Sequence, residues 1–370
     1  MKWFHGESSS KKSGKGRKIM VVILAVLSVS VIIVLAGAWS IFGEKLKAAK
    51  TVRRLEDGLY YMEYNGDYGF DAFLEQGGAA SDADMAVYIT KFLSNGFFQT
   101  GNNPVDKDFG CSSLCAGTVS GSQLMGRNFD WKKCNAIIVH TIPDNGYESI
   151  STCNIDFLGF GENWKPEGAT NQYMALAAIY VPLDGMNEKG LCVADLINGD
   201  EEETHQKSGK TDLTTVSAIR LLLDKASTVD EAVSLLCEYD MNSSIGTAHH
   251  LAVSDAEGKS VVIEYVNNEM VVTQTSVVTN HYLSVGEKYG IGNEESHKRY
   301  DTLLTIWQSN KGIMDNRTLQ EVMETVSYPD ITQWSIVYDK TNRMVDFYWQ
   351  KQYDVPYHFE LGAFYREKKE

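Results

Sequence analysis

Short runs of β-branched and aromatic residues dominate the sequence after Cys111, and Asp, Asn and Gly separate them. Such runs are typical of strands, which we expect at Leu114–Val119, Ala136–Thr141, Ala175–Val181, His250–Val253, Val261–Tyr265, Met270–Gln274, Ser335–Tyr338 and Met344–Trp349. Apolar residues three and four apart predict helices over Thr215–Ala226, Thr228–Leu236, Lys298–Gln308 and Leu319–Val326. Strands and helices grouped in this way predict an α+β layered sandwich.

Residues 19–43 contain no charged side chain and are mostly Val, Ile, Leu and Ala. As a helix this segment would extend about 37 Å, enough to cross a hydrocarbon core about 30 Å thick. The sequence therefore predicts one N-terminal transmembrane helix that acts as a signal anchor. Residues 1–18 are basic and are expected to form a cytoplasmic tail, with everything after Glu44 outside the cell membrane. A cleaved signal peptide is the alternative, because Ala36-Gly37-Ala38 fits a cleavage site; either way the rest is exported.

The formal net charge is −15, and because residues 1–18 are basic, the remainder is more acidic still. An acidic surface repels phosphate backbones, so nucleic acid is excluded as a partner. All six cysteines follow the apolar segment, and none lies in a CxxC pair or in a Cys/His cluster with zinc spacing. We therefore expect no metal, and we expect the cysteines other than Cys111 to be small buried hydrophobic residues.

Cys111 is the candidate nucleophile, because Arg127 and Asp130 follow it within a segment predicted as strand, turn, strand. A thiol with its ordinary pKa of about 8.5 is mostly protonated at neutral pH, so it needs a base or a positive neighbour. One solution is a histidine, as in papain-like proteases. The candidates for that role are His249, His250 and His281.

The other solution is an N-terminal nucleophile. Cleavage between Gly110 and Cys111 would free an α-amino group, which titrates near 7.7–8.0 and can act as the base of its own residue. A glycine suits such a junction, because it permits the strained backbone that self-cleavage requires.

Five motifs resemble those of the choloylglycine hydrolase family of linear amide C–N hydrolases, which includes bile salt hydrolases, penicillin V acylases and, more distantly, acid ceramidase. They are Cys111-Ser112-Ser113, Gly126-Arg127-Asn128-Phe129-Asp130-Trp131, Asp184-Gly185-Met186-Asn187-Glu188-Lys189-Gly190-Leu191, Val278-Thr279-Asn280 and Ser296-His297-Lys298-Arg299-Tyr300. The resemblance covers about Ser81 to Phe359 and keeps the family's order. It implies a four-layer αββα sandwich of the N-terminal-nucleophile hydrolase type.

The resemblance also implies the roles of the site residues. Cys111 matches the residue that is both nucleophile and base, and Arg127 and Asp130 match the pair that orients its amine and thiol. Asn280 matches an asparagine that donates to the oxyanion, and Arg299 matches a second supporting arginine.

A further oxyanion contributor is expected after Leu191. Asn198 is the candidate, although it lies about one position late for the bile-salt pattern. No cofactor is expected.

Residues 44–110 precede the nucleophile and divide into a charged stretch expected to be helical, Glu44–Asp57, a tyrosine-rich part and a helix that starts near Ser81. Ceramidase-like relatives keep such an upstream piece after self-cleavage. The resemblance therefore implies a pro-segment or small α-subunit over 44–110 and a catalytic domain over 111–370.

The expected activity is hydrolysis of a small-molecule amide, an N-acyl conjugate such as a conjugated bile acid, penicillin V or an N-acyl amine, through a thioester acyl-enzyme. An acyltransferase of the same fold and an inactive surface binding protein are the alternatives. The resemblance also suggests a homo-oligomer, since relatives often form tetramers.

Overall fold

The computed structural model describes residues 42–94, 110–161 and 164–362. The chain divides into two compact units, 1–47 and 48–370. The predicted signal anchor and basic tail lie outside the described residues, apart from 42 and 43, which begin a helix that continues to residue 51. None of the helices in the described ranges is long and apolar enough to cross a membrane.

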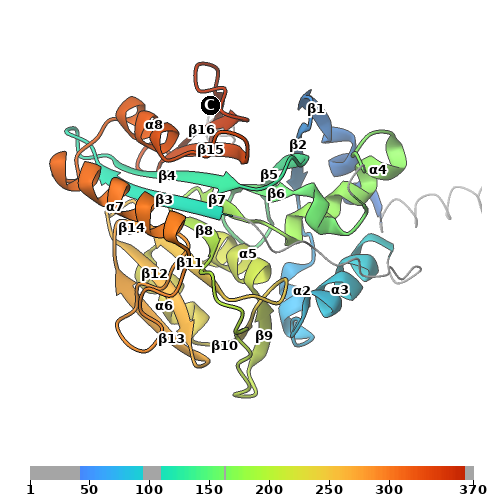
Figure 1. Cartoon of the computed structure of the whole chain (residues 1–370). Helices are drawn as coiled ribbons and strands as arrows, with labels where there is room; N and C mark the ends of the chain where they lie inside the picture. The colour runs from blue at the N-terminus through green and yellow to red at the C-terminus, as the bar shows by residue number, and fades with distance from the viewer. Residues whose placement is uncertain (1–41, 95–109, 162–163, 363–370) are drawn as a thin grey trace, which may run out of the picture. The chain divides into compact units, whose positions relative to one another are not determined.

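A nine-stranded sheet crosses the second unit (Figure 1). Its neighbouring strands pair antiparallel except β2 and β5, which are parallel. In spatial order the strands are β1 (Arg53–Glu56), β2 (Leu59–Asn65), β5 (Ala136–Ile142), β6 (Ser149–Asn154), β7 (Asp184–Asn187), β8 (Cys192–Ile197), β11 (His249–Ser254), β12 (Ser260–Val266) and β13 (Glu269–Gln274).

A six-stranded antiparallel sheet packs against the first. Its spatial order is β14 (Val277–Val278), β3 (Gly110–Gly117), β4 (Gln123–Asp130), β15 (Thr332–Asp339), β16 (Met344–Trp349) and β17 (Tyr357–Glu360). Two further short strands, β9 (Thr211–Thr214) and β10 (Tyr239–Asn242), pair parallel with each other.

The core between the sheets is built from alternate residues of facing strands. Met125 and Phe129 point inward from β4, and Ile138 and Leu196 meet them from β5 and β8. Phe129 stacks on Trp334 of the neighbouring strand with ring centroids 4.1 Å apart. Because side chains alternate across a strand, one face of each sheet fills this layer and the other face is left for helices.

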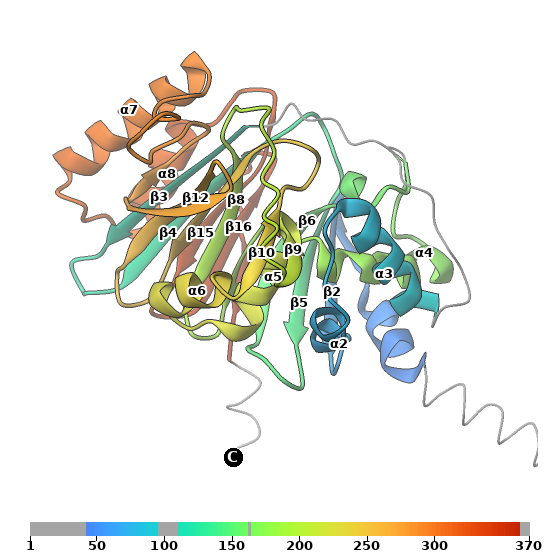
Figure 2. The same cartoon turned by 90° about the horizontal axis from the view of Figure 1, so that it is seen from below.

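Helices cover both outer faces (Figures 1 and 2). The nine-stranded sheet is covered by α5 (Thr215–Lys225) and α6 (Val229–Leu236), and the six-stranded sheet by α7 (Glu294–Ser309) and α8 (Asn316–Thr325). The order helix, sheet, sheet, helix is the four-layer sandwich that the family resemblance implies, and it agrees with the layered α+β fold predicted from the residues. Besides the helix over residues 42–51, the described ranges contain α2 (Phe70–Glu75), α3 (Asp82–Ser94), α4 (Ala169–Met174) and the short 3-10 helices η1 (Ile155–Leu158) and η2 (Ala175–Tyr180).

Local capping explains where two of these helices begin. The Thr228 hydroxyl accepts the Glu231 N–H at 3.2 Å at the start of α6, as the sequence pattern predicts. The Asn293 side chain accepts the Ser296 N–H at 2.7 Å at the start of α7. This second cap fixes the first turn of the helix that carries Arg299.

Two predicted elements are wrong. Ala175–Val181 was expected as a strand, but Ala175–Tyr180 forms η2; all six of its side chains are buried, and a continuous apolar run has no alternation by which to separate a helix from a strand. The helix expected to reach Asp57 ends at residue 51, and Arg53–Glu56 is β1. The cause is Asp57-Gly58, a two-residue turn that pairs Glu56 with Leu59 in a hairpin.

Candidate active site

Cys111 is the second residue of β3 and is fully buried. Strand β3 pairs with β4 so that Gly110 lies opposite Asp130 and Cys111 lies opposite Phe129. Arg127 is two residues before Phe129, so alternation along β4 places both on one face of the sheet. The register of a single hairpin thus brings the predicted nucleophile next to both of its predicted charged partners.

The Arg127 guanidinium is fully buried and held on three sides. Nη1 donates to the Asn128 carbonyl at 2.8 Å, Nη2 donates to the Asp195 carbonyl at 2.7 Å, and Nε lies 3.5 Å from Oδ2 of Asp184. Burial disfavours the charge of Arg127, but Cys111 and Asp184 outweigh burial and raise its pKa. Arg127 is therefore a fixed positive charge beside the thiol.

Asp130, Arg299 and Asn280 form a chain of contacts that ends at the main chain of Cys111. Arg299 Nη1 donates to Asp130 Oδ2 at 2.6 Å, and Nη2 donates to Asn280 Oδ1 at 2.8 Å. The same Asn280 oxygen accepts the Cys111 N–H at 2.7 Å. Asp130 is also held by the Thr332 hydroxyl, at 2.6 Å.

Burial raises the pKa of the Cys111 thiol to about 12; Arg127 lowers it, while Asp130 and Asp195 raise it. The thiol of this continuous chain is therefore protonated at neutral pH. Its nitrogen is a peptide amide joined to Gly110, so it cannot yet act as a base.

Gly110 has no positive φ, contrary to the expectation that a strained backbone explains the glycine. A Cβ at this position would lie 3.3 Å from Asp130 Oδ2 and 3.4 Å from Arg299 Nη2. A side chain at this position would therefore press on the ion pair, which packs directly against the peptide that precedes Cys111.

Asn198 follows β8 and is fully buried, and neither atom of its amide has a hydrogen-bond partner among the described residues. The amide is close enough to the Tyr282 hydroxyl to oppose the rise to about 12 that burial gives the pKa of Tyr282, but the two side chains do not have the geometry of a hydrogen bond. An unpaired buried amide is costly and is free to donate to a bound molecule.

Asn280 differs from its predicted role in one respect. Its Nδ2 atom, the expected oxyanion donor, donates to the Ile197 carbonyl at 2.7 Å, and its oxygen faces Cys111. In this arrangement Asn280 positions the nitrogen of Cys111, and it also binds the residue immediately before Asn198.

The histidines that a papain-like mechanism would need are engaged elsewhere. His249 contacts Asp195 Oδ1 at 2.8 Å and the Ser244 carbonyl at 2.9 Å. His250 contacts Glu264 at 3.0 Å and the Thr279 carbonyl at 2.8 Å. His281 lies beside Ser296 Oγ at 2.9 Å. These contacts make them parts of the structure around the site.

Sequence reasoning missed Asp184 and Thr332 as parts of the site. Asp184 opens one of the five motifs, but its contact with Arg127 crosses from one sheet to the other. Among the other cysteines, four are buried as expected, whereas Cys237 is exposed, and none of the six forms a disulfide.

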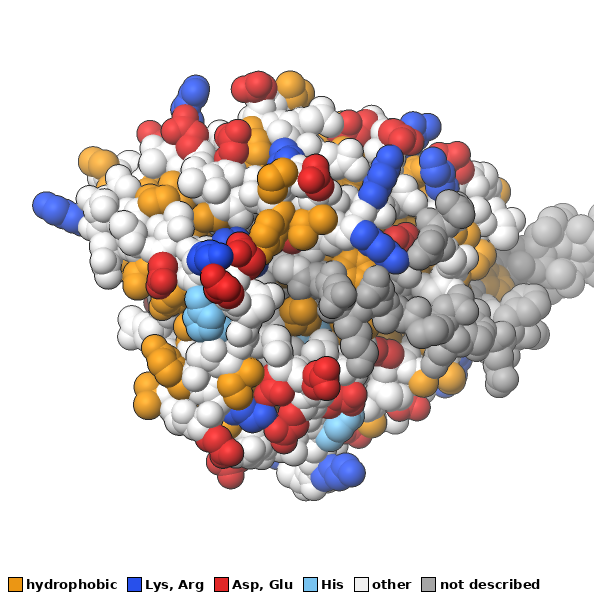
Figure 3. Space-filling model, in the orientation of Figure 1, with side chains coloured by type: hydrophobic (Ala, Val, Ile, Leu, Met, Phe, Trp, Pro, Cys, Tyr) orange, Lys and Arg blue, Asp and Glu red, His pale blue; other side chains and the backbone are white. Residues whose placement is uncertain are grey.

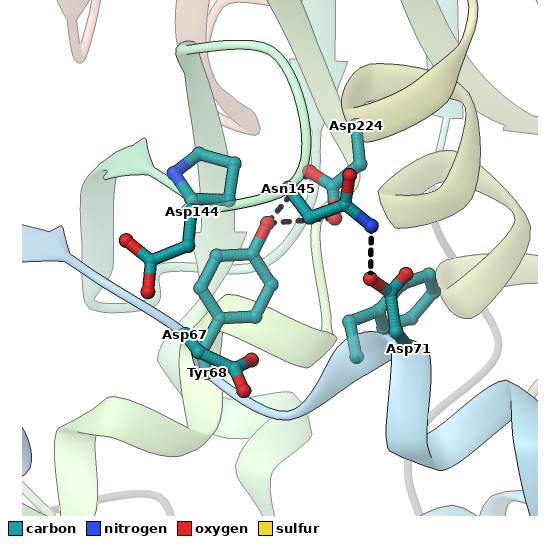
Figure 4. A pocket seen from close by; sticks show the side chains of 8 residues that line it. Asp67, Tyr68, Asp71, Asp144, Asn145 and Asp224 are labelled. Atoms are coloured by element: carbon teal, nitrogen blue, oxygen red, sulfur yellow. Dashed lines mark hydrogen bonds between the residues drawn. The ribbon is translucent and has the colours of Figure 1, made fainter.

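A second polar region lies apart from Cys111, in a pocket of about 150 Å³ that Asp67, Asp71, Asp144 and Asp224 help to line (Figure 4). Three of these carboxylates have partners: Asp71 contacts Lys225 at 2.8 Å, Asp224 accepts the Tyr68 hydroxyl at 2.6 Å, and Asp67 accepts the Gly69 N–H at 2.6 Å. In the described ranges no group of three or more His, Cys, Asp or Glu is arranged to hold a metal ion. Acidic side chains also gather on the lower part of the surface in Figure 3.

A cysteine on a strand of an αββα sandwich, near Arg127, Asp130, Asn280 and Arg299, is the arrangement that the resemblance to linear amide C–N hydrolases implies. Residues 111–283 match the family described as linear amide C–N hydrolases, choloylglycine hydrolase family, which confirms the predicted resemblance. Members of this family are hydrolases that act on carbon–nitrogen bonds, the enzyme class that the sequence predicts, and the matched residues span a little less than half of this chain.

Two relatives show how far the similarity extends. Over 111 residues the chain is 32% identical to penicillin V acylase from Pectobacterium atrosepticum, a match that covers 26% of this chain and 29% of that protein. The crystal structure of a mutant conjugated bile acid hydrolase from Clostridium perfringens aligns with a TM-score of 0.50 and 17% identity, covering 68% of this chain and 92% of that one. The second comparison shows a shared fold.

Proposed function

We propose that this protein hydrolyses a linear, non-peptide amide with Cys111 as the nucleophile, after cleavage between Gly110 and Cys111 frees the α-amino group. The observation that carries the proposal is the position of Asn280 Oδ1, which accepts from Cys111 N at 2.7 Å and from Arg299 Nη2 at 2.8 Å. Asn280 thereby already fixes the direction of the Cys111 N–H, and this nitrogen would become the base after cleavage.

Self-cleavage would begin with attack of the Cys111 sulfur on the Gly110 carbonyl carbon. The C–N bond breaks, the nitrogen takes up the thiol proton, and a thioester joins Gly110 to Cys111. Water then hydrolyses the thioester, leaving a carboxylate on Gly110 and a free thiol and amine on Cys111. The close packing of Asp130 and Arg299 against Gly110 supports this step, because both can orient the peptide that is cut.

In turnover, the amine accepts the thiol proton while the sulfur attacks the substrate carbonyl. The leaving amine takes the proton, a thioester acyl-enzyme remains, and water releases the acid. The buried charge of Arg127 favours the thiolate. The unpaired amide of Asn198 can donate to the developing oxyanion, a contribution worth about 3–4 kcal/mol in comparable sites.

The proposed substrate is an N-acyl conjugate. Penicillin V and conjugated bile acids are the first candidates, because the two relatives are named for them. A panel of glycine- and taurine-conjugated bile acids, penicillin V and N-acyl amines tests the proposal, with mass analysis of the protein to detect a new N-terminus at Cys111. Hydrolysis by a chain that remains uncut would overturn the mechanism, and conjugate formation with an added amine would identify an acyltransferase.

We also propose that the chain is exported and held at the cell membrane by residues 19–43, with 44–110 kept as a small subunit after cleavage. The uncharged segment and the basic residues before it support this location. Fractionation of cells that produce the full chain tests it: recovery in the membrane fraction with external protease sensitivity is expected, and recovery in the cytoplasm would contradict it.

A further inference from the structure

Asp184, the first residue of β7, has a carboxylate that is fully buried between the two sheets. Its Oδ2 accepts the Trp334 Nε1–H at 3.0 Å, and its Oδ1 accepts the Tyr338 hydroxyl at 3.2 Å. The Nε atom of Arg127 lies 3.5 Å from Oδ2. One carboxylate of the nine-stranded sheet thus accepts two hydrogen bonds and faces one guanidinium of the six-stranded sheet.

A buried carboxylate is costly unless it is paired, and so is a buried guanidinium. Asp184 and Arg127 are each fully buried, and each stabilises the charge of the other. Burial still raises the pKa of Asp184, although Arg127, Trp334 and Tyr338 oppose that rise. Arg127 donates hydrogen bonds to two main-chain carbonyls, those of Asn128 and Asp195, while its Nε atom makes no hydrogen bond with a described residue. The Asp184 carboxylate faces this edge of the guanidinium at 3.5 Å and supplies a countercharge there.

We propose that Asp184 is a positioning residue for the reaction at Cys111: through Arg127, it sets the orientation and the effective positive charge that act on the thiol. This inference rests on the proposed function, in which Cys111 is the nucleophile. It gives the aspartate of the motif Asp184–Leu191 a role that the predicted mechanism does not assign.

Loss of the Asp184 charge leaves Arg127 a stronger cation beside the sulfur. The thiol should then ionise more readily, since an opposite charge within a few ångströms lowers a pKa by about 1–3 units. The freed guanidinium should also lose its fixed direction, which lowers the rate of the reaction although the thiol is more acidic.

The test compares Asp184→Asn with the wild type, both as the full processed chain. The measurements are the pH profile of Cys111 alkylation by iodoacetamide, kcat, KM and the unfolding temperature. We expect the midpoint of alkylation to move down by about one pH unit, and kcat to fall by about tenfold or more with KM little changed.

A matched control is Asp224→Asn. Asp224 is also buried, contacts Arg220 at 2.8 Å and accepts a tyrosine hydroxyl, that of Tyr68, but it lies on α5 at the outer side of the nine-stranded sheet. We expect this variant to lose stability while it keeps the wild-type alkylation midpoint. If Asp184→Asn keeps the wild-type alkylation midpoint and loses stability as the control does, Asp184 has only a structural role and the proposal is wrong.

Two more variants keep the test decisive. In an Arg127→Gln background, Asp184→Asn should cause no further shift of the alkylation midpoint, because it acts through Arg127; a full shift there would contradict the proposal.

If Asp184→Asn does not fold, Tyr338→Phe removes one hydrogen-bond donor to Asp184 and leaves the Asp184 charge, and it should lower kcat several-fold. An unchanged kcat in Tyr338→Phe would count against the proposal. The failure of the proposed function is recognised separately, by turnover in Cys111→Ala.

Discussion

Nη1 of Arg299 lies 2.6 Å from Oδ2 of Asp130, although 169 residues separate them in the chain. The contact joins α7 to the end of β4, and the second terminal nitrogen of Arg299 reaches Asn280 at 2.8 Å. One guanidinium therefore binds both side chains that flank the Gly110–Cys111 peptide, the Asp130 carboxylate and the Asn280 amide.

Arg299→Lys should therefore weaken activity strongly. A lysine can keep one charge contact but cannot span both acceptors as the planar guanidinium does. We expect kcat/KM to fall by about 100-fold, since small displacements of reacting groups have effects of that size. Arg317→Lys is the control, because Arg317 is exposed and pairs only with Glu321 in the described contacts; a similar loss in both variants would contradict the role of Arg299.

Cys111→Ala should fold, remain uncut and show no turnover. The side chain lost is small, and neither step of the proposed chemistry can start without the sulfur. Intact mass and substrate hydrolysis measure both outcomes. Cys115→Ala serves as the control, because Cys115 is a buried cysteine of the same strand; it should be processed and active. Turnover by Cys111→Ala would assign the nucleophile to another residue.

Asn198→Ala should lower kcat by about 10²–10³-fold, the effect of removing one oxyanion donor. Its stability should be unchanged or higher, because the wild-type amide is buried without a partner. Asn187→Ala offers the contrast: the Asn187 side chain donates to the Leu223 and Ala226 carbonyls, so that variant should unfold at a lower temperature. A loss of stability in Asn198→Ala without a loss of kcat would exclude the oxyanion role.

Glu264→Gln should make stability less dependent on pH in the acid range. Burial opposes the Glu264 charge, but His250 and the N–H groups of Leu283 and Ser284 outweigh it and hold the pKa of Glu264 below 4.5. The carboxylate therefore stabilises the fold fully above pH 4.5, and this stabilisation is lost as pH falls through the lowered pKa.

Urea unfolding at several pH values measures this effect. At pH 7 the variant should be less stable by about 1–3 kcal/mol, and the difference should shrink below pH 4.5. Glu321→Gln, at an exposed ion pair, should change stability by less than about 1 kcal/mol. A difference that stays constant down to pH 3 would show that the charge of Glu264 is not responsible.

The part of the site that sequence could predict is the part built by neighbouring strands. Cys111, Arg127 and Asp130 meet because β3 and β4 form one hairpin, whose two strands are visible in the sequence. No local pattern connects Asn280 or Arg299 with Cys111; only the resemblance to a family placed them there.

Contacts between the two sheets could not be predicted either, because no local sequence pattern connects their residues. Asp184 reaches Trp334 across 150 residues, because two sheets face each other. Hydrophobic periodicity predicts which face of a strand is buried, but it does not say which strand of another sheet lies opposite. The four layers could be expected, whereas the ion pairs that cross them could not.

Strand β2 lies inside the nine-stranded sheet, between β1 and β5, and its Tyr60 and Met62 are buried. Cleavage after Gly110 would thus leave a short chain whose strands β1 and β2 pair within the sheet of the long chain. The cleaved protein should elute as one peak in native gel filtration and give two bands in denaturing electrophoresis. The two fragments would then share the strand pairing of β2 with β5 inside their common sheet.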